Sequence, residues 1–497
     1  MTETAALPPA RRFVLAGALA VALSVLTGGL SPTAGAQPNA PSPLIRVVVT
    51  SATGWSDAAA AVIAAGGNVL DQLPLVGGVS ADLPRDAVLA PSYIVAPDRP
   101  MTPVQTDAPA GAVSTVRDTL GQGPAGSGPD GNGVTVAVVD TGVADIPDLA
   151  GRLSHLDVPG ESRGDGYGHG TLVAGLIAGD GSLSGGAYAG VAPGAQVLDV
   201  RVAGDDGSSS LIRVLRGLQA VADRPDVDVV NLSLTSGSPL PYQLDPLTRA
   251  LEALWQQGVV VVVPAGNGDA IGSPGLDPML LTVGGLVEAG TADRTDDAVA
   301  TWSSRGPAAQ GVAKPDLVAP GASLIGTAAP GSAAAAAQWR TDVPPGYAAG
   351  SGTSFATAVT SGAAAVLLGE RDLAPDQVKQ LVTGTAYRSA ALGDRDAAGS
   401  GGLDLGAALA APAPAGTGPA AADGPPGQRK RLAAGAARPE WAASNWAASN
   451  WAASNWAASN WAASNWAASN WAASNWAASN WAASNWAASN WAASNWG

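Results

Sequence analysis

The chain has no cysteine and only two histidines among its 497 residues. The lack of cysteine excludes thiol nucleophiles, thiolate zinc sites and disulfides. Because histidine is the usual general base near neutral pH, only His155 and His169 can be candidates for that role. Basic residues are also scarce, with 25 Lys and Arg against 40 Asp and Glu. The resulting net charge of −15 argues against a nucleic-acid partner, which usually requires a basic face.

Long apolar runs are rare as well. The run from Phe13 to Leu26 is shorter than the ~20 residues that span a bilayer. Arg11-Arg12 precede it and Ala34-Gly35-Ala36 follow it, a pattern typical of a signal peptide over residues 1–36. The paired arginines are compatible both with twin-arginine export and with ordinary export. No later segment is long and apolar enough for a membrane span, so we expect a secreted, extracellular protein, released or attached to the cell surface.

Residues 37–107 have the pattern of a small α+β unit. The order of the predicted elements is β-α-β-β-α-β, which is typical of a ferredoxin-like fold. Residues 100–133, which overlap the end of this unit, are rich in proline and glycine and predict a linker. The predicted elements are a strand at Leu44–Val49, a helix at Ser56–Ala65, two strands within Val69–Leu83, a helix at Asp86–Ala90 and a strand at Tyr93–Val95.

In residues 108–411, apolar runs alternate with helical spacing. Near-continuous apolar runs suit parallel strands that are buried on both faces. The alternation predicts an α/β fold with a central parallel sheet and right-handed crossovers. The predicted strands are Val134–Val139, Gln196–Val202, Val227–Leu234 and Val259–Val263, and the predicted helices are Thr171–Ala178, Leu211–Ala222, Leu244–Gln257, Thr353–Leu368 and Pro375–Thr385.

The C-terminal part is a low-complexity repeat tail. Residues 412–440 are rich in Ala, Pro and Gly and predict a flexible linker. Residues 441–497 repeat the pentapeptide WAASN, whose period matches neither a helix nor a strand. Disorder and a β-solenoid both remain open for this tail. Regular tryptophans can stack on sugars or other aromatics, so binding to the cell wall or cell surface is a hypothesis for the tail.

Three residues have the types and contexts of an acyl-transfer site. Asp140 follows a predicted strand, His169 lies between two glycines, and Ser354 lies at a predicted helix start, where backbone N–H groups stabilise negative charge. A serine hydroxyl becomes a nucleophile when a base takes its proton, and a carboxylate usually orients that base. Each residue alone is compatible with a cap or a turn. The combination favours catalysis by Asp140, His169 and Ser354.

The segments VAVVDTGV (136–143), GHGTLVAG (168–175) and GTSFATAVTSGAAA (352–365) resemble the three signature blocks of the subtilisin-like serine proteases. The order Asp, His, Ser is also that of subtilisin. The resemblance extends from about Val134 to Ala411. It implies the family's three-layer α/β fold, endopeptidase activity and no required cofactor. Further matching blocks are Gly190–Pro193, Val230–Leu234, Ala265–Asn267 and Lys314–Gly321.

The resemblance also implies how the substrate is held. Asn267 would donate its side-chain amide to the oxyanion, together with the backbone N–H of Ser354. Two segments would flank the substrate's first pocket, and the first of them would pair its backbone with the bound peptide as an added strand. These substrate-binding residues are Ser233, Leu234 and Thr235, and Pro264, Ala265 and Gly266.

The chain departs from the family pattern at two places. Thr235 and Ser236 replace two glycines of many members, which is expected to narrow the cleft. The stretch 178–189 lacks the Asn-rich loop that holds calcium in many secreted members. Asp180 is its only carboxylate, whereas calcium needs 6–8 oxygen ligands, so no metal site is expected there. Calcium at other positions stays open.

Residues 37–107 resemble the family's N-terminal propeptide, which assists folding and blocks the cleft until it is removed. Cleavage is expected between Pro97 and Gly133. The sequence thus predicts a secreted serine endopeptidase made as a self-processed precursor, with polypeptide substrates and its own propeptide as partners. The alternative is a cell-surface binding protein whose tryptophan tail sets its function and whose peptidase domain only processes itself.

Overall fold

The computed structural model describes residues 42–105, 116–238, 240–306, 312–336 and 343–414. The predicted signal peptide, the repeat tail and the boundary between residues 107 and 108 lie outside these ranges. Only the first three residues of the predicted linker 412–440 lie inside them. No helix in the described ranges is both long enough and apolar enough to cross a membrane.

Buried, valine-rich segments form the central sheet of the described chain, which has eight strands. Every pairing in it is parallel except that of β13 with β14. The sheet is therefore mixed rather than wholly parallel, although the exception is a two-residue strand at one edge. The strands in sheet order are β14 (Ala298–Val299), β13 (Leu281–Val287), β12 (Val260–Pro264), β10 (Val229–Leu232), β6 (Thr135–Asp140), β8 (Gln196–Arg201) and β7 (Leu153–His155), with β15 (Leu317–Pro320) also beside β13.

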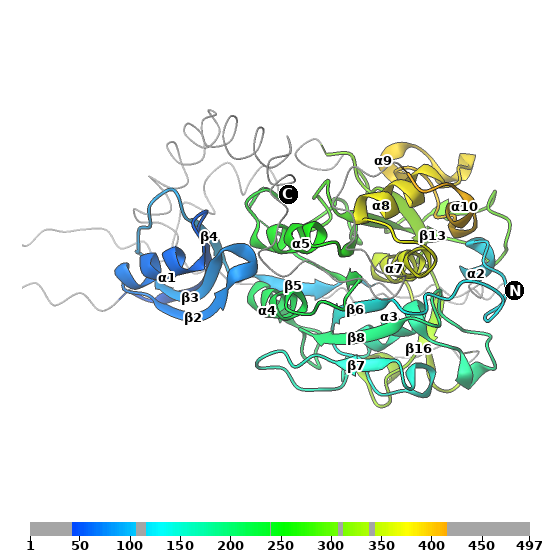
Figure 1. Ribbon diagram of the computed structural model, residues 1–497, viewed down its shortest axis with the longest axis horizontal. Helices are drawn as coiled ribbons and strands as arrows, with labels where there is room; N and C mark the ends of the chain where they lie inside the picture. Colours follow the sequence, from blue (N-terminus) through cyan, green and yellow to red (C-terminus); the bar gives the residue numbers. More distant parts are fainter. Residues whose placement is uncertain (1–41, 106–115, 239, 307–311, 337–342, 415–497) are drawn as a thin grey trace, which may run out of the picture. The chain divides into compact units, whose positions relative to one another are not determined.

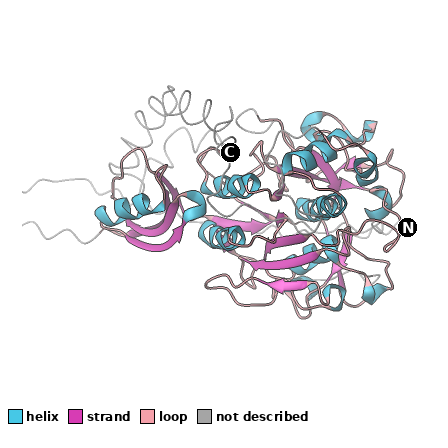
Figure 2. Ribbon diagram, viewed as in Figure 1, coloured by secondary structure: helices cyan, strands magenta, loops and turns pink. Residues whose placement is uncertain are grey.

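Two pairs of helices complete a three-layer arrangement with the sheet in the middle. Helices α3 (His169–Ala178) and α7 (Thr353–Glu370) contact each other and one face of the sheet. Helices α4 (Leu211–Ala222) and α5 (Pro246–Gln256) contact each other and cover the other face (Figures 1 and 2). The layers explain why the strands are apolar on both sides.

Capping residues set where several of these helices begin. Ser210 accepts a hydrogen bond from the backbone N–H of Arg213 at the start of α4. Asp245 caps α5, which begins at Pro246, so this helix starts two residues later than the sequence predicts. Helix α3 begins at His169 itself rather than at Thr171. The helices predicted within Leu211–Ala222, Thr353–Leu368 and Pro375–Thr385 are confirmed.

The N-terminal unit, residues 43–97, has its own four-stranded antiparallel sheet in the order β2-β3-β1-β4, covered by one helix. The helix predicted at Asp86–Ala90 is wrong, because this segment is a turn followed by irregular backbone. The six residues between Pro84 and Pro91 are too few to sustain a helix without strong packing. The elements are β1 (Leu44–Thr50), α1 (Trp55–Ala64), β2 (Asn68–Leu73), β3 (Gly78–Pro84) and β4 (Ile94–Pro97).

The linker predicted from residue 100 is also wrong at its start, because Pro100–Pro103 form strand β5. This strand is the middle one of a three-stranded sheet, antiparallel to both β11 (Leu234–Thr235) and β9 (Ser209–Ser210). Met101 on β5 is fully buried within the main hydrophobic core. Tertiary packing therefore turns a proline-rich connection into a strand.

Shorter elements complete the described part of the chain. Strands β16 and β17 form an antiparallel hairpin that contacts α3. The remaining elements are β16 (Leu324–Thr327), β17 (Tyr347–Gly350), α2 (Val116–Thr119), α6 (Ala333–Ala336), α8 (Pro375–Gly384), α9 (Arg395–Ala398) and α10 (Leu405–Ala410).

Candidate active site

The structure brings the three candidate catalytic residues to one region of the buried core. Asp140 ends β6, His169 begins α3, and Ser354 lies in the first turn of α7. All three are buried. The rings of His169 and Phe355 lie 5.3 Å apart between centroids, so the imidazole rests against the residue that follows Ser354.

Asp140 and His169 form a tight pair. The imidazole Nδ1 lies 2.7 Å from the Asp140 Oδ1 atom, which also accepts a hydrogen bond from the backbone N–H of Thr141. A carboxylate at this position fixes the proton on Nδ1 and leaves Nε2 as the acceptor. Nε2 is buried and has no hydrogen-bond partner among the described residues. The pair therefore presents a free basic nitrogen.

The glycines on either side of His169 are required by close packing. Gly168 has φ of +99°, a conformation that favours glycine. A β carbon on Gly170 would lie 2.1 Å from the carbonyl oxygen of Gly142. The motif around the histidine thus reflects how closely α3 approaches the end of β6.

A buried carboxylate holds the loop that precedes His169. Asp165 accepts hydrogen bonds from the backbone N–H groups of Gly168 (2.7 Å) and Thr171 (2.8 Å), and from the hydroxyls of Thr141 and Thr171. Burial raises the pKa of Asp165, and these donors oppose that shift. The carboxylate links the residue after Asp140 to the start of α3.

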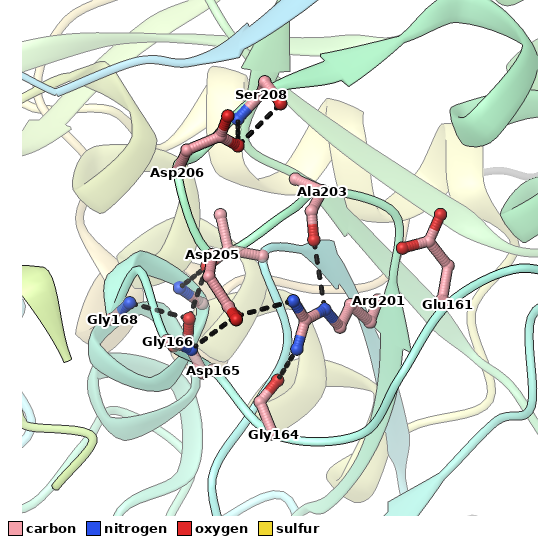
Figure 3. Close-up of polar contacts among 12 residues, drawn as sticks. Glu161, Gly164, Asp165, Gly166, Gly168, Arg201, Ala203, Asp205, Asp206 and Ser208 are labelled. Carbon is pink, nitrogen blue, oxygen red and sulfur yellow. Dashed lines mark hydrogen bonds and ion pairs between the residues drawn. The ribbon is translucent and has the colours of Figure 1, made fainter. Parts of the chain in front are cut away.

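Arg201 fastens the same loop from the end of β8. Its guanidinium donates to the carbonyl oxygens of Gly164 and Ala203, and it pairs with Asp205 at 2.8 Å (Figure 3). Asp205 in turn accepts from the backbone N–H of Gly166 (Figure 3). The loop that precedes His169 is therefore hydrogen bonded to Arg201 on β8, the strand that pairs with β6 beside Asp140.

The Ser354 hydroxyl is directed toward a backbone carbonyl rather than toward His169. Its Oγ donates to the Ser233 carbonyl oxygen at 3.0 Å and accepts from the backbone N–H of Val104 at 3.1 Å. The side chain of Asn231 donates to Ser233 Oγ, which steadies this segment. In many enzymes the hydrogen bond between nucleophile and base is long or poorly aligned until the reaction begins, so this geometry does not exclude Ser354 as a nucleophile.

A peptide carbonyl is held at the start of α7. The backbone N–H of Ser354 donates to the Val104 carbonyl oxygen at 3.2 Å. Asn267 Oδ1 accepts from both the backbone N–H and the hydroxyl of Thr353. These bonds direct the amide nitrogen Nδ2 the other way, and it is buried without a hydrogen-bond partner in the described chain.

The Val104 carbonyl oxygen and the Asn267 Nδ2 atom both lie close to the α carbon of Gly352. A β carbon on this residue would lie 2.4 Å from the Val104 carbonyl oxygen and 3.1 Å from Asn267 Nδ2. Its φ of +150° also favours glycine. The carbonyl oxygen of Val104 accepts from the Ser354 N–H, and the unpartnered Asn267 Nδ2 lies nearby, so both amides are available to stabilise negative charge in this region.

Of the two segments expected to bind substrate, one pairs with β5 and the other contacts Thr353 at the start of α7. Leu234 and Thr235 pair with Pro103 and Thr102 of β5, and the Ser233 carbonyl accepts from the N–H of Val104. Residues 264–266 lead from the end of β12 to Asn267, and the N–H of Gly266 donates to the Thr353 hydroxyl. One segment therefore contacts a bound strand, while the other supports the amide side chain.

Sequence reasoning missed several residues of this region. Arg99 and Asp245 form a buried ion pair beside β5, and nothing in the local sequence around Arg99 indicates it. Asp245 could have been recognised as a helix cap because Pro246 follows it. Asp165, four residues before His169, gave only the weak signal of a carboxylate in a glycine-rich loop.

No group of three or more His, Cys, Asp or Glu side chains is placed to hold a metal ion in the described ranges. Asp180 lies 3.6 Å from Arg152, and the buried Asp148 accepts from the Tyr347 hydroxyl and from Leu183 N–H. These carboxylates are thus already engaged with protein donors.

Comparison with known proteins gives a consistent result. The model of the Subtilase family matches residues 131–406, more than half of the chain. Serine protease AprX of Bacillus subtilis is 42% identical over 269 residues, which cover 51% of this chain and 61% of that protein. Subtilisin Savinase of Lederbergia lenta is 38% identical over 240 residues, which cover 48% of this chain and 77% of that protein.

The structure resembles that of fervidolysin from Fervidobacterium pennivorans, a keratinolytic enzyme related to subtilisin. The TM-score is 0.59 at 25% identity, and the match covers 76% of this chain and 63% of that one. The chain thus spans about three fifths of the length of AprX and of fervidolysin. With its mostly parallel sheet between two helix layers, the chain has the subtilisin-like α/β fold and belongs to the Subtilase family.

Proposed function

We propose that the protein is a serine endopeptidase that cleaves peptide bonds with Asp140, His169 and Ser354, assisted by Asn267. One observation carries this proposal: the Val104 carbonyl is bound by the Ser354 N–H while β5 pairs with β11. An extended chain with one carbonyl beside a serine at a helix N-terminus is the arrangement of a peptidase substrate. The family membership of the chain supports the same activity.

The reaction follows from the roles of the four groups. His169 Nε2 takes the proton from Ser354 Oγ, which attacks the carbonyl carbon of the bound peptide. Asp140 holds the imidazole and stabilises its positive charge. The developing negative oxygen accepts from the Ser354 N–H and from Asn267 Nδ2. The imidazolium then gives its proton to the leaving amine, and water releases the acyl group by the reverse steps.

Before attack, the Ser354 hydroxyl must leave the Ser233 carbonyl and turn toward His169. A change of the Ser354 χ1 torsion moves the hydroxyl while the backbone stays in place. The proposed attack also explains why Nε2 is kept free of other partners. A base that was already hydrogen bonded elsewhere would have to break that bond first.

The same geometry supports self-processing of a precursor. The bond next to the bound carbonyl is Val104–Gln105, which falls within the expected interval between Pro97 and Gly133. Residues 37–104 would act as a propeptide, since β5 occupies the cleft that a substrate needs. Export by the segment 1–36 and action outside the cell complete this proposal.

The variant Ser354→Ala tests it in the full-length chain. We expect the wild-type protein to hydrolyse casein and to acquire a new N-terminus at Gln105, detected by mass spectrometry of the intact protein. Ser354→Ala should do neither, whereas Ser162→Ala, an exposed serine, should behave as the wild type. Maturation and casein cleavage by purified Ser354→Ala would overturn the assignment.

A further inference from the structure

Arg99 makes a buried ion pair that the proposed catalytic steps do not use. Its Nη2 lies 2.7 Å from both carboxylate oxygens of Asp245, and its Nε donates to Ser236 Oγ at 2.9 Å. The Arg99 side chain is only 7% exposed and that of Asp245 is 0% exposed. A fully buried carboxylate is costly unless a cation and further donors accompany it.

The Arg99 guanidinium lies in a polar site formed by Asp245, Ser236 and Ser273, which come from three segments of the chain. Asp245 caps α5 and accepts from the N–H of Leu247, Ser236 follows β11, and the Ser273 hydroxyl donates to Asp245 Oδ2 at 2.6 Å. Ser236 and Ser273 are joined by a backbone hydrogen bond. The Asp245 carboxylate is therefore also held by donors other than Arg99.

The position of Arg99 relative to the reacting carbonyl is set by β5. The strand is held on one side by β11 and on the other by β9, and the Arg99 carbonyl accepts from the N–H of Leu211. If cleavage follows Val104, Arg99 is the sixth residue before the cleaved bond. Any peptide that replaces residues 99–104 in this register brings its own sixth residue to Asp245.

We propose that Asp245, Ser236 and Ser273 form a guanidinium-binding subsite, and that the enzyme prefers polypeptides with arginine six residues before the cleaved bond. This proposal rests on the proposed peptidase function. Arginine fits better than lysine because its planar fork can reach both carboxylate oxygens and the serine hydroxyl, whereas an ammonium is a single point charge. In the precursor, Arg99 itself occupies the subsite.

The test compares two peptides with the sequence of residues 98–106, one of them carrying neutral citrulline in place of Arg99. With the mature wild-type enzyme, the citrulline peptide should show kcat/KM about 10- to 100-fold lower, the size expected for a charged hydrogen-bonded contact. The loss should lie mainly in KM, because the contact is remote from the reacting atoms and binds substrate and transition state alike.

The variant Asp245→Asn provides the matched enzyme. Asparagine can still cap α5, so the fold is expected to be preserved. This variant should cleave the two peptides with equal efficiency. A replacement at the exposed Thr102 of the peptide should have little effect on either enzyme.

The outcomes separate the two proposals. Equal cleavage of both peptides by the wild type would overturn the subsite and leave the peptidase intact. If the wild-type enzyme cleaves neither of the two peptides and also fails to cleave casein, the proposed peptidase function is overturned instead. The wild-type comparison decides the subsite even if Asp245→Asn does not fold.

Discussion

Each of the two histidines is paired with a buried aspartate, and the two aspartates lie on neighbouring strands. His169 Nδ1 lies 2.7 Å from Asp140, at the end of β6, and His155 Nδ1 lies 2.8 Å from Asp199, on β8. Strands β6 and β8 pair in parallel, and both aspartates are almost completely buried. Judged by the imidazole and its carboxylate alone, the two pairs are nearly the same.

The second ring nitrogen distinguishes them. Nε2 of His169 is buried without a partner beside the start of α7. Nε2 of His155 lies 3.4 Å from Asp145, whose side chain is 91% exposed. A histidine paired with an aspartate is therefore compatible with a catalytic role and with a structural role, and the surroundings of the other ring nitrogen are what separate the roles proposed for His169 and His155.

The largest expected difference in kcat is between the variants that neutralise Asp140 and Asp199. Asp140→Asn should lower kcat by about 10⁴-fold, because an amide favours the wrong imidazole tautomer. Asp199→Asn should leave kcat near the wild-type value and lower the melting temperature instead. Steady-state kinetics on casein and thermal unfolding measure the two effects. Equal losses of kcat in both variants would contradict the proposal that Asp140 serves catalysis and Asp199 serves stability.

A second contrast is the proposed oxyanion-binding role of Asn267, whose side-chain nitrogen has no hydrogen-bond partner among the described residues. Asn267→Ala should lower kcat by about 10²–10³-fold with little change in KM, a range that comes from the same change in a subtilisin. Kinetics with a short peptide substrate would measure it, with the exposed Asn132→Ala as a control. A change confined to KM would show that Asn267 binds the ground state rather than the transition state.

The smallest effect concerns His155 and pH. The hydrogen bond to Asp199 raises the pKa of His155, while burial opposes the shift. Stability from the protonated ring is therefore fully present below the unfolded pKa of about 6.5, and it is lost as pH rises through the raised folded pKa. His155→Gln should reduce the free energy of unfolding by about 1–2 kcal/mol at pH 5.5 and by less at pH 9.

That measurement uses Ser354→Ala as the parent protein, so that self-digestion does not interfere. Thermal or denaturant unfolding at both pH values gives the comparison. A loss that is equal at pH 5.5 and pH 9 would mean that His155 contributes through packing rather than through charge.

Many of the strands and helices could be predicted from the sequence because the residue patterns that specify them are local. The valine run before Asp140 and the apolar spacing of Leu211–Ala222 each specify an element that is buried where it forms. Strand β13 was missed, since Gly284-Gly285 interrupt its apolar pattern. These glycines allow close packing, as a β carbon on Gly285 would lie 2.3 Å from the ring of Trp302.

The contacts that sequence reasoning missed depend on partners far along the chain. Arg99 meets Asp245 across 146 positions, and β5 forms only because β9 and β11 offer it two edges. The second partner of the Ser354 hydroxyl, the N–H of Val104, is likewise 250 positions away. Local residue patterns contain no information about such pairings until the sheet is assembled.

The place of β5 as a middle strand also determines what shape of substrate can react. Strand β9 pairs with residues 100–101 and β11 pairs with residues 102–103, so both would lack a partner if β5 left after the proposed cleavage. A substrate that takes the place of residues 99–104 would need about six extended residues, about 20 Å long, to reach from Asp245 to Ser354. Helices and tight turns in folded proteins do not present such a stretch. Loosely folded proteins are therefore expected to be digested first, and compact native proteins only where they unfold locally.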